Sequence, residues 1–424
     1  MPGPTQHSVT FSPVSGSLKI DLFFDATLSM KGFTLTQTSS SYQQSVPLLE
    51  RAVIEGWRGG EAAFFKFGDE IATLPGRAFL EAIKPQFYSD AKYNKRTFIE
   101  RVIDRADVDH LTVIVTDLFQ DNADVNQLST KLKNKFIANG LSIGVLGIRS
   151  QYDGTVYDVG SDNHSFSYKS SEKPESGRPF YLLAFGSHAN VAHYFTTLES
   201  SGMSSFPERH ALILSRFITA QSAPFATAKL NTANKMSEIS SSNLIESSTS
   251  QDHTKAFQIT KGRTETSFST QWPYSALPNV MEHAAVLASE LTAWKAENTG
   301  GKQLTLVESS RAKTALEITA RLFPESGAFN KLDLQARLNV KELPASGKYC
   351  YRIVLRPSSY SLPSWVSEWN MRDSEIKAWH MKVGQFNGAK TYNLENFLGT
   401  VQGAVLNTTP PEVGEIYIYL KVDK

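Results

Sequence analysis

Three side chains that carry oxygen follow the first apolar run of the sequence. Asp25, Thr27 and Ser29 stand at alternate positions after residues 20–24, IDLFF. Oxygens at i, i+2 and i+4 on a loop that turns back into a helix can converge on one point, and they suit a hard divalent cation such as Mg²⁺. The apolar run has the length and β-favouring residues of a buried strand. We therefore expect the three side chains at the carboxyl edge of a sheet, where open α/β sheets bind ligands.

A second buried strand also ends in an aspartate. Residues 111–117 read LTVIVTD and are dense in β-branched side chains, so they predict a strand that ends at Asp117. In a doubly wound sheet this strand can lie beside the first one, which would bring Asp25 and Asp117 to the same crevice. Thr97 begins a helical pattern just before this strand, where its hydroxyl can cap the helix and can also approach that crevice.

The elements that must position these residues alternate between strand and helix from residue 18 to residue 201. Helical patterns over 46–57, 125–138 and 189–198 alternate with strands around 61–74, 111–117, 141–148 and 179–186. This alternation predicts one doubly wound α/β domain, Rossmann-like in its layers, with a mostly parallel sheet and helices on both faces. The polar segment 149–178 is long for a simple connection and predicts an ordered insertion.

The sequence pattern changes to a period of two in the remaining chain, residues 206–424. Runs such as KTALEITARLFPE, KLDLQARLNVKEL and EIYIYLKV alternate apolar with polar residues and are separated by turn residues. They predict a mainly antiparallel β-sandwich domain, with helical insertions at 364–371 and 393–406. Residues 281–296 fit a helix or a strand. Residues 231–252 are rich in Ser and Thr and predict a flexible stretch, and residues 1–17 predict an N-terminal extension.

In the order and spacing of these motifs, residues 18–201 resemble the von Willebrand factor A (vWA) domain family, which includes integrin I domains. That family carries a metal-ion-dependent adhesion site (MIDAS) built from Asp-x-Ser-x-Ser, a loop threonine and an aspartate at a strand end. The resemblance implies that Asp25, Thr27, Ser29, Thr97 and Asp117 bind Mg²⁺, or Mn²⁺ or Ca²⁺ in its place. Here Thr27 replaces the first serine, and Leu118 stands where the family commonly has glycine.

Composition narrows the range of partners. Lys and Arg total 43 against 42 Asp and Glu, so charge favours neither nucleic acid nor an anionic membrane as a partner. The single cysteine, Cys350, excludes an intrachain disulfide and a multi-cysteine zinc site. No run reaches the roughly 18 apolar residues of a membrane span, and the N-terminus lacks the pattern of a signal peptide. These features predict a cytoplasmic protein.

Together the motifs predict a protein-protein interaction module rather than an enzyme. A bound cation would keep a coordination position for an Asp or Glu of a protein partner, as the family resemblance implies. Family analogy also places such domains in multi-component assemblies, including complexes that contain an ATPase. One alternative is a metal-dependent phosphohydrolase with Asp25 as nucleophile, although Thr27 stands where that chemistry usually has a second carboxylate. The other alternative is a structural scaffold with a degenerate metal site.

Overall fold

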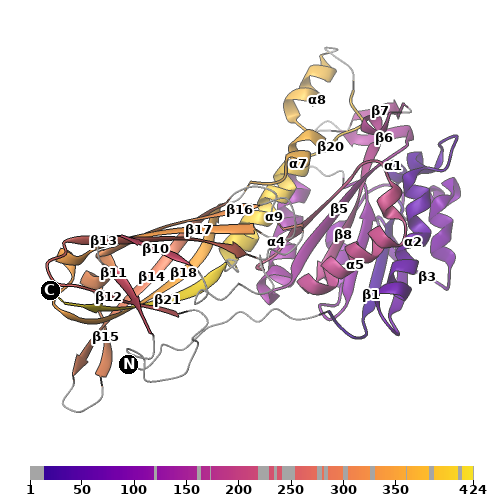
Figure 1. Cartoon of the computed structure of the whole chain (residues 1–424). Helices are drawn as coiled ribbons and strands as arrows, with labels where there is room; N and C mark the ends of the chain where they lie inside the picture. Colours follow the sequence, from indigo (N-terminus) through magenta and orange to yellow (C-terminus); the bar gives the residue numbers. More distant parts are fainter. Residues whose placement is uncertain are drawn as a thin grey trace. The chain divides into compact units, whose positions relative to one another are not determined.

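The chain divides into two compact units (Figure 1). The structure is a computed structural model, and it describes residues 14–118, 122–159, 164–171, 173–217, 229–233, 236–240, 254–274, 279–280, 285–298, 304–324, 330–359, 361–381, 386–408 and 413–423. The α/β unit comprises Ser12–Arg216 together with Leu362–Thr409. The β-rich unit includes residues 217–361 and 410–424. Residues 362–409 thus leave the β-rich unit and pack with the α/β unit.

A seven-stranded sheet forms the centre of the α/β unit, in the order β3-β2-β1-β4-β8-β5-β9. Its strands are β1 (Lys19–Asp25), β2 (Glu61–Phe67), β3 (Ile71–Leu74), β4 (Leu111–Thr116), β5 (Ser142–Ser150), β8 (Arg178–Gly186) and β9 (Arg209–Leu214). β1 lies between β2 and β4 and is parallel to both. Every residue of β4, β5 and β8 is buried, as expected for strands that are covered on both faces.

The predicted doubly wound sheet is wrong, because four of its six strand pairings are antiparallel, including that of β3 with β2. β8 runs antiparallel to both of its neighbours, β4 and β5, and β9 is antiparallel to β5. A parallel neighbour would need a crossover connection between β5 and β8, usually a helix. Between them the described chain contains instead the hairpin of β6 (Asp153–Val159) and β7 (His164–Lys169) and a short 3-10 turn, η5 (Pro174–Ser176). The chain therefore returns beside β5 in the opposite direction.

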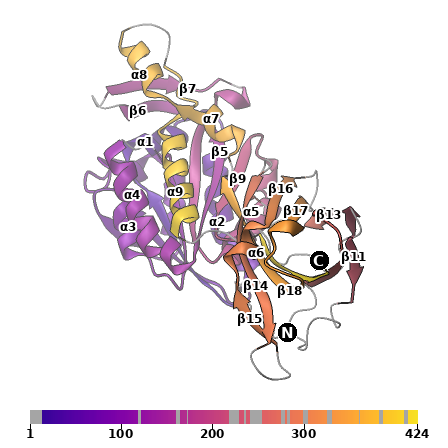
Figure 2. The same cartoon turned by 90° about the vertical axis from the view of Figure 1, so that its left-hand side faces the viewer.

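Helices cover both faces of this sheet (Figure 2). One face carries α2 (Ser41–Gly56) and α5 (His188–Ser200), which pack on each other. The other face carries α3 (Ile99–Arg105), α4 (Asn122–Lys135) and α9 (Leu394–Thr408), with α4 packed between the other two. A short helix, α1 (Leu28–Lys31), follows β1.

The C-terminal segment supplies part of one helical layer of the α/β unit. α9 buries a stripe at helical spacing, made of Leu394, Phe397, Leu398, Val401 and Val405, in the same core cluster as α3 and α4. α7 (Ser364–Trp369) adds its two tryptophans to this cluster. α8 (Asp373–His380) lies between two short strands, β19 (Asn370–Met371) and β20 (Thr391–Tyr392), which pair in parallel. The helices predicted at 364–371 and 393–406 are thus confirmed as α7 and α9.

The β-rich unit contains one ten-stranded sheet, so the predicted β-sandwich is also wrong. The order is β10-β13-β17-β16-β14-β18-β21-β12-β11, with β15 beside β14, and the end strands β10 and β11 come close to each other. The sheet therefore curls almost fully onto itself (Figure 2). Its strands are β10 (Leu230–Ala233), β11 (Met236–Ile239), β12 (Thr254–Ile259), β13 (Glu265–Tyr274), β14 (Ala285–Asn298), β15 (Leu304–Glu308), β16 (Leu316–Pro324), β17 (Asn330–Asn339), β18 (Gly347–Ser359) and β21 (Gly414–Val422), and a short helix, α6 (Ser310–Thr314), joins β15 to β16.

The period of two in the sequence correctly predicts strands in this unit, but it does not predict how the sheet is closed. In β17, Leu332, Leu334, Ala336 and Leu338 are buried while the residues between them are partly or fully exposed. Such alternation shows that one face is covered, but a second sheet and the far wall of the same curled sheet cover it equally well. In the ambiguous segment 281–296, residues 285–296 belong to the strand β14, and residues 281–284 lie outside the described residues.

Two further expectations, a flexible stretch at 231–252 and the absence of a membrane span, can be compared with the described residues only. The stretch 231–252 holds most of β10 and all of β11, while residues 234–235 and 241–252 lie outside the described residues. None of the described helices is both long and apolar enough to cross a membrane.

Candidate metal centre at the edge of the α/β sheet

The register of β1 and β4 places the two predicted aspartates at one edge of the sheet. The last pair between these parallel strands is Phe24 with Val115, so Asp25 lies level with Thr116 and Asp117 follows directly. The side chains of Asp25 and Asp117 are almost completely buried. The two strands end at the same edge because they have similar lengths, seven residues in β1 and six in β4, and because Ile20 of β1 pairs with Leu111, the first residue of β4.

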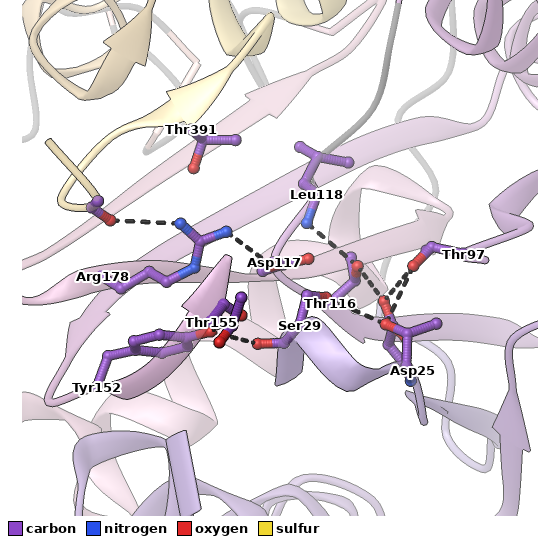
Figure 3. Close-up of polar contacts among 12 residues, drawn as sticks. Asp25, Ser29, Thr97, Thr116, Asp117, Leu118, Tyr152, Thr155, Arg178 and Thr391 are labelled. Carbon is purple, nitrogen blue, oxygen red and sulfur yellow. Dashed lines mark hydrogen bonds and ion pairs between the residues drawn. The ribbon is translucent and has the colours of Figure 1, made fainter. Parts of the chain in front are cut away.

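Both carboxylate oxygens of Asp25 accept hydrogen bonds (Figure 3). Oδ1 accepts from the backbone N–H of Thr27 at 3.0 Å and from its hydroxyl at 2.6 Å. Oδ2 accepts from the hydroxyls of Thr116 at 2.8 Å and Thr97 at 3.1 Å. These donors come from three separate segments of the chain, so Asp25 is the point on which β1, β4 and the loop before α3 converge.

Three hydroxyls form a cluster beside this carboxylate. The Thr27 Oγ1 atom lies 3.1 Å from Ser29 Oγ and 3.3 Å from Thr97 Oγ1. Thr97 does not cap α3 as predicted: the N-cap residue is Phe98, and no side chain caps the helix there. The Thr97 hydroxyl is turned toward Asp25 instead.

Backbone hydrogen bonds hold the Asp25–Ser29 loop in this shape. The N–H of Ala26 donates to the carbonyl of Phe67 at 2.8 Å, and the N–H of Leu28 donates to that of Asn94 at 3.1 Å. The Tyr152 hydroxyl donates to the Ser29 carbonyl at 3.0 Å, shared with the Thr155 carbonyl at 2.7 Å. These contacts tie the loop to β2, to the segment before Thr97 and to the β6–β7 hairpin.

Asp117 is held by a buried arginine (Figure 3). The Nη2 atom of Arg178, the first residue of β8, donates to Asp117 Oδ2 at 2.8 Å, and both side chains are 1% exposed. The Nη1 atom of Arg178 donates to the carbonyl of Gly388 at 3.3 Å. Asp117 is therefore linked through Arg178 to the C-terminal segment of the α/β unit.

The surroundings of Asp25 disfavour its charged form. Burial, and then the charge of Asp117, raise the pKa of the Asp25 carboxyl from 3.8 to about 6, although hydrogen bonds from Thr27 and Thr116 oppose this rise. A buried carboxylate is destabilised because it has lost its hydration and repels its neighbour. A cation at this point would relieve both effects.

The structure brings together most of the residues that the sequence indicated. Asp25, Thr27, Ser29 and Thr97 are joined by hydrogen bonds, and Asp117 lies close enough to Asp25 to affect its pKa. Sequence reasoning missed Thr116, Arg178 and Tyr152. Thr116 could have been found, because it directly precedes Asp117 in the strand. Arg178 and Tyr152 carry no such signal, because each reaches the site from a distant part of the sequence.

The oxygen spacing at this cluster is compatible with a small hard cation. Adjacent oxygens around Mg²⁺ at 2.0–2.1 Å lie about 2.9 Å apart. The separations from Thr27 Oγ1 to Asp25, Ser29 and Thr97 bracket this value. Within the described residues no group of three or more His, Cys, Asp or Glu is placed to hold a metal ion. A cation here would depend on hydroxyl oxygens and one or two carboxylates.

Comparison with known proteins gives no family for this chain. Neither a scan of protein-family models nor a search of curated proteins found a match. The resemblance of residues 18–201 to vWA domains therefore stays a prediction.

Proposed function

We propose that the α/β unit is a divalent-cation-dependent docking module, in which a Mg²⁺-type ion binds Asp25, Thr27, Ser29 and Thr97, with Asp117 beside it. The observation that carries this proposal is the convergence of three side-chain oxygens, from Asp25, Ser29 and Thr97, on Thr27 Oγ1. An ion held there would supply a fixed positive centre that attracts an Asp or Glu of a protein partner. Mg²⁺ and Mn²⁺ commonly keep positions for water or an outside ligand.

The side from which a partner could approach follows from burial. Asp25 is fully buried, whereas Ser29 and Thr97 are partly exposed. A partner's carboxylate would therefore reach the ion past these two hydroxyls. In this proposal the chain acts in the cytoplasm, within a multi-component assembly that contains an ATPase, and the assembly rests on the family resemblance alone.

The proposal is tested first by thermal unfolding of the full chain after chelator treatment, with and without millimolar Mg²⁺ or Mn²⁺. An ion at a hundred times its dissociation constant stabilises the folded state by about 2.7 kcal/mol. We expect an upward shift of the midpoint for the unaltered chain and no shift for Asp25→Asn. Asp21→Asn is the matched control, because Asp21 lies on the same strand but pairs with His110 rather than with the site.

Docking of a carboxylate is tested with Mn²⁺ as a probe. Mn²⁺ bound to the chain with an open position enhances the relaxation of water protons, and this enhancement should fall when glutamate replaces chloride at equal ionic strength. No cation-dependent shift in the unaltered chain would contradict the metal site and leave the scaffold alternative. Hydrolysis of a generic phosphoester that is lost in Asp25→Asn would instead favour the phosphohydrolase.

A further inference from the structure

A buried arginine lies beside the proposed cation site, paired with Asp117. Arg178 and Asp117 form an ion pair with both side chains 1% exposed, and Asp117 in turn raises the pKa of Asp25. An arginine buried so completely is stable only when it is paired and hydrogen-bonded. Its position at the first residue of β8 results from the antiparallel course of β8 beside β4, which brings the start of β8 to the edge where β4 ends.

Several neighbours fix the guanidinium in place. The carbonyl of Gly388 accepts from Nη1, and the Tyr152 ring lies 5.4 Å from the guanidinium carbon. The Gly388 backbone rests on the ring of Tyr168, where a Cβ atom would come within 2.3 Å of ring carbons. The Ala389 carbonyl accepts from Arg149 at 3.0 Å. The C-terminal segment thus holds Arg178 against Asp117.

Arg178 changes the net charge of the site when a divalent cation is bound. Asp25 and Asp117 contribute two negative charges, and Arg178 cancels one of them. A divalent cation bound at such a site leaves a net charge of about +1, which attracts a carboxylate. Without Arg178 the two negative charges of the aspartates would cancel the charge of the ion, and the cation-bound site would be neutral. A neutral site would not attract an anion electrostatically.

We propose that Arg178 is the residue that sets the specificity of this site: it weakens cation binding by neutralising Asp117, and it thereby lets the bound cation recruit an anionic partner group. This inference rests on the proposed function, because it assumes that a divalent cation binds beside Asp25. It predicts opposite effects on the two ligands, which a merely structural role of Arg178 would not produce.

The test uses the full chain and Mn²⁺ alone, with free Mn²⁺ measured by electron paramagnetic resonance. Arg178→Gln should bind Mn²⁺ about tenfold more tightly than the unaltered chain, since a buried carboxylate becomes uncompensated near the ion. Glutamate should displace Mn²⁺-bound water less readily from this variant. Arg178→Lys keeps the positive charge, and its Mn²⁺ affinity should stay within about threefold of that of the unaltered chain.

A double variant keeps the test decisive if Arg178→Gln fails to fold. Asp117→Asn with Arg178→Gln removes both members of the pair and leaves the net charge unchanged, so its Mn²⁺ affinity should match that of the unaltered chain. A tenfold loss in the double variant would overturn the inference, because Asp117 would then be contributing charge to the ion. Equal Mn²⁺ binding by the unaltered chain and Arg178→Gln would overturn it too, yet leave the cation site intact. Failure of the unaltered chain and of every variant to bind Mn²⁺ would overturn the proposed function together with the inference.

Discussion

The Thr116 hydroxyl donates to Asp25 Oδ2 at 2.8 Å across two parallel strands, and this bond joins β4 to the centre of the site. The same hydroxyl oxygen accepts from the N–H of Leu118 at 3.1 Å. Leu118 has a φ of 51°, in the left-handed region that non-glycine residues rarely adopt. One buried hydroxyl therefore supports both the carboxylate and the turn that carries the chain past Asp117.

Replacing Thr116 with valine should destabilise the fold more than the same change at Thr112. Both threonines are buried on β4, but among the described residues the Thr112 hydroxyl has no hydrogen-bond partner. Loss of a bond to a buried carboxylate costs about 1.5–3 kcal/mol. We expect Thr116→Val to lower the free energy of unfolding by about this amount, measured by chemical denaturation. Thr112→Val should be neutral or stabilising, and equal losses at the two positions would contradict the role of Thr116.

Asp25 should make the stability of the chain depend on pH in chelator-treated buffer. Its pKa is about 6 in the folded protein and about 3.9 in an unfolded chain. The folded state therefore holds more protons around and between these values, and the free energy of unfolding falls by roughly 3 kcal/mol as pH rises from about 3 to about 7. Asp25→Asn should remove this fall and be the more stable protein at pH 7. Parallel pH profiles for the two proteins would count against a raised pKa.

Gly32 should not accept a side chain. A Cβ atom there would lie 2.3 Å from the ring of Tyr152, which also bonds the Ser29 carbonyl. Overpacking of this kind costs about 1–3 kcal/mol, and we expect Gly32→Ala to lose that much in denaturation experiments. Gly403 in α9 is the control, since a Cβ atom there has no atom within 4 Å. Gly403→Ala should stabilise by roughly 0.5–1 kcal/mol, because alanine is the better helix former.

The C-terminal helix α9 should unfold with the α/β unit. Leu398 is fully buried in the core cluster shared with α3 and α4, so Leu398→Ala should cost about 2–5 kcal/mol. Hydrogen exchange should then speed up in α9 and α4 rather than in β12 and β21 of the β-rich unit. Val286, which is 55% exposed on β14, gives a control, and Val286→Ala should leave exchange in α4 unchanged. Faster exchange confined to β12 and β21 after Leu398→Ala would contradict the assignment of α9.

Local patterns in the sequence were enough to identify the elements and most of the candidate site. An apolar run that ends in an aspartate is recognisable at Asp25 and at Asp117 because a strand and its terminal residue are contiguous. The period of two likewise identified strands such as β17, and helical spacing identified α9. In each case the physical cause, burial of one face or one stripe, acts on neighbouring residues.

Only the tertiary structure decided how these elements pair. Nothing in the sequence around Arg178 shows that β8 runs antiparallel to β4 and so delivers an arginine to Asp117, because that depends on the path of the β6–β7 hairpin. The curled sheet of the β-rich unit and the packing of α9 against α4 are likewise contacts between segments far apart in the chain. Periodicity records that a face is buried, but it carries no information about which distant surface buries it.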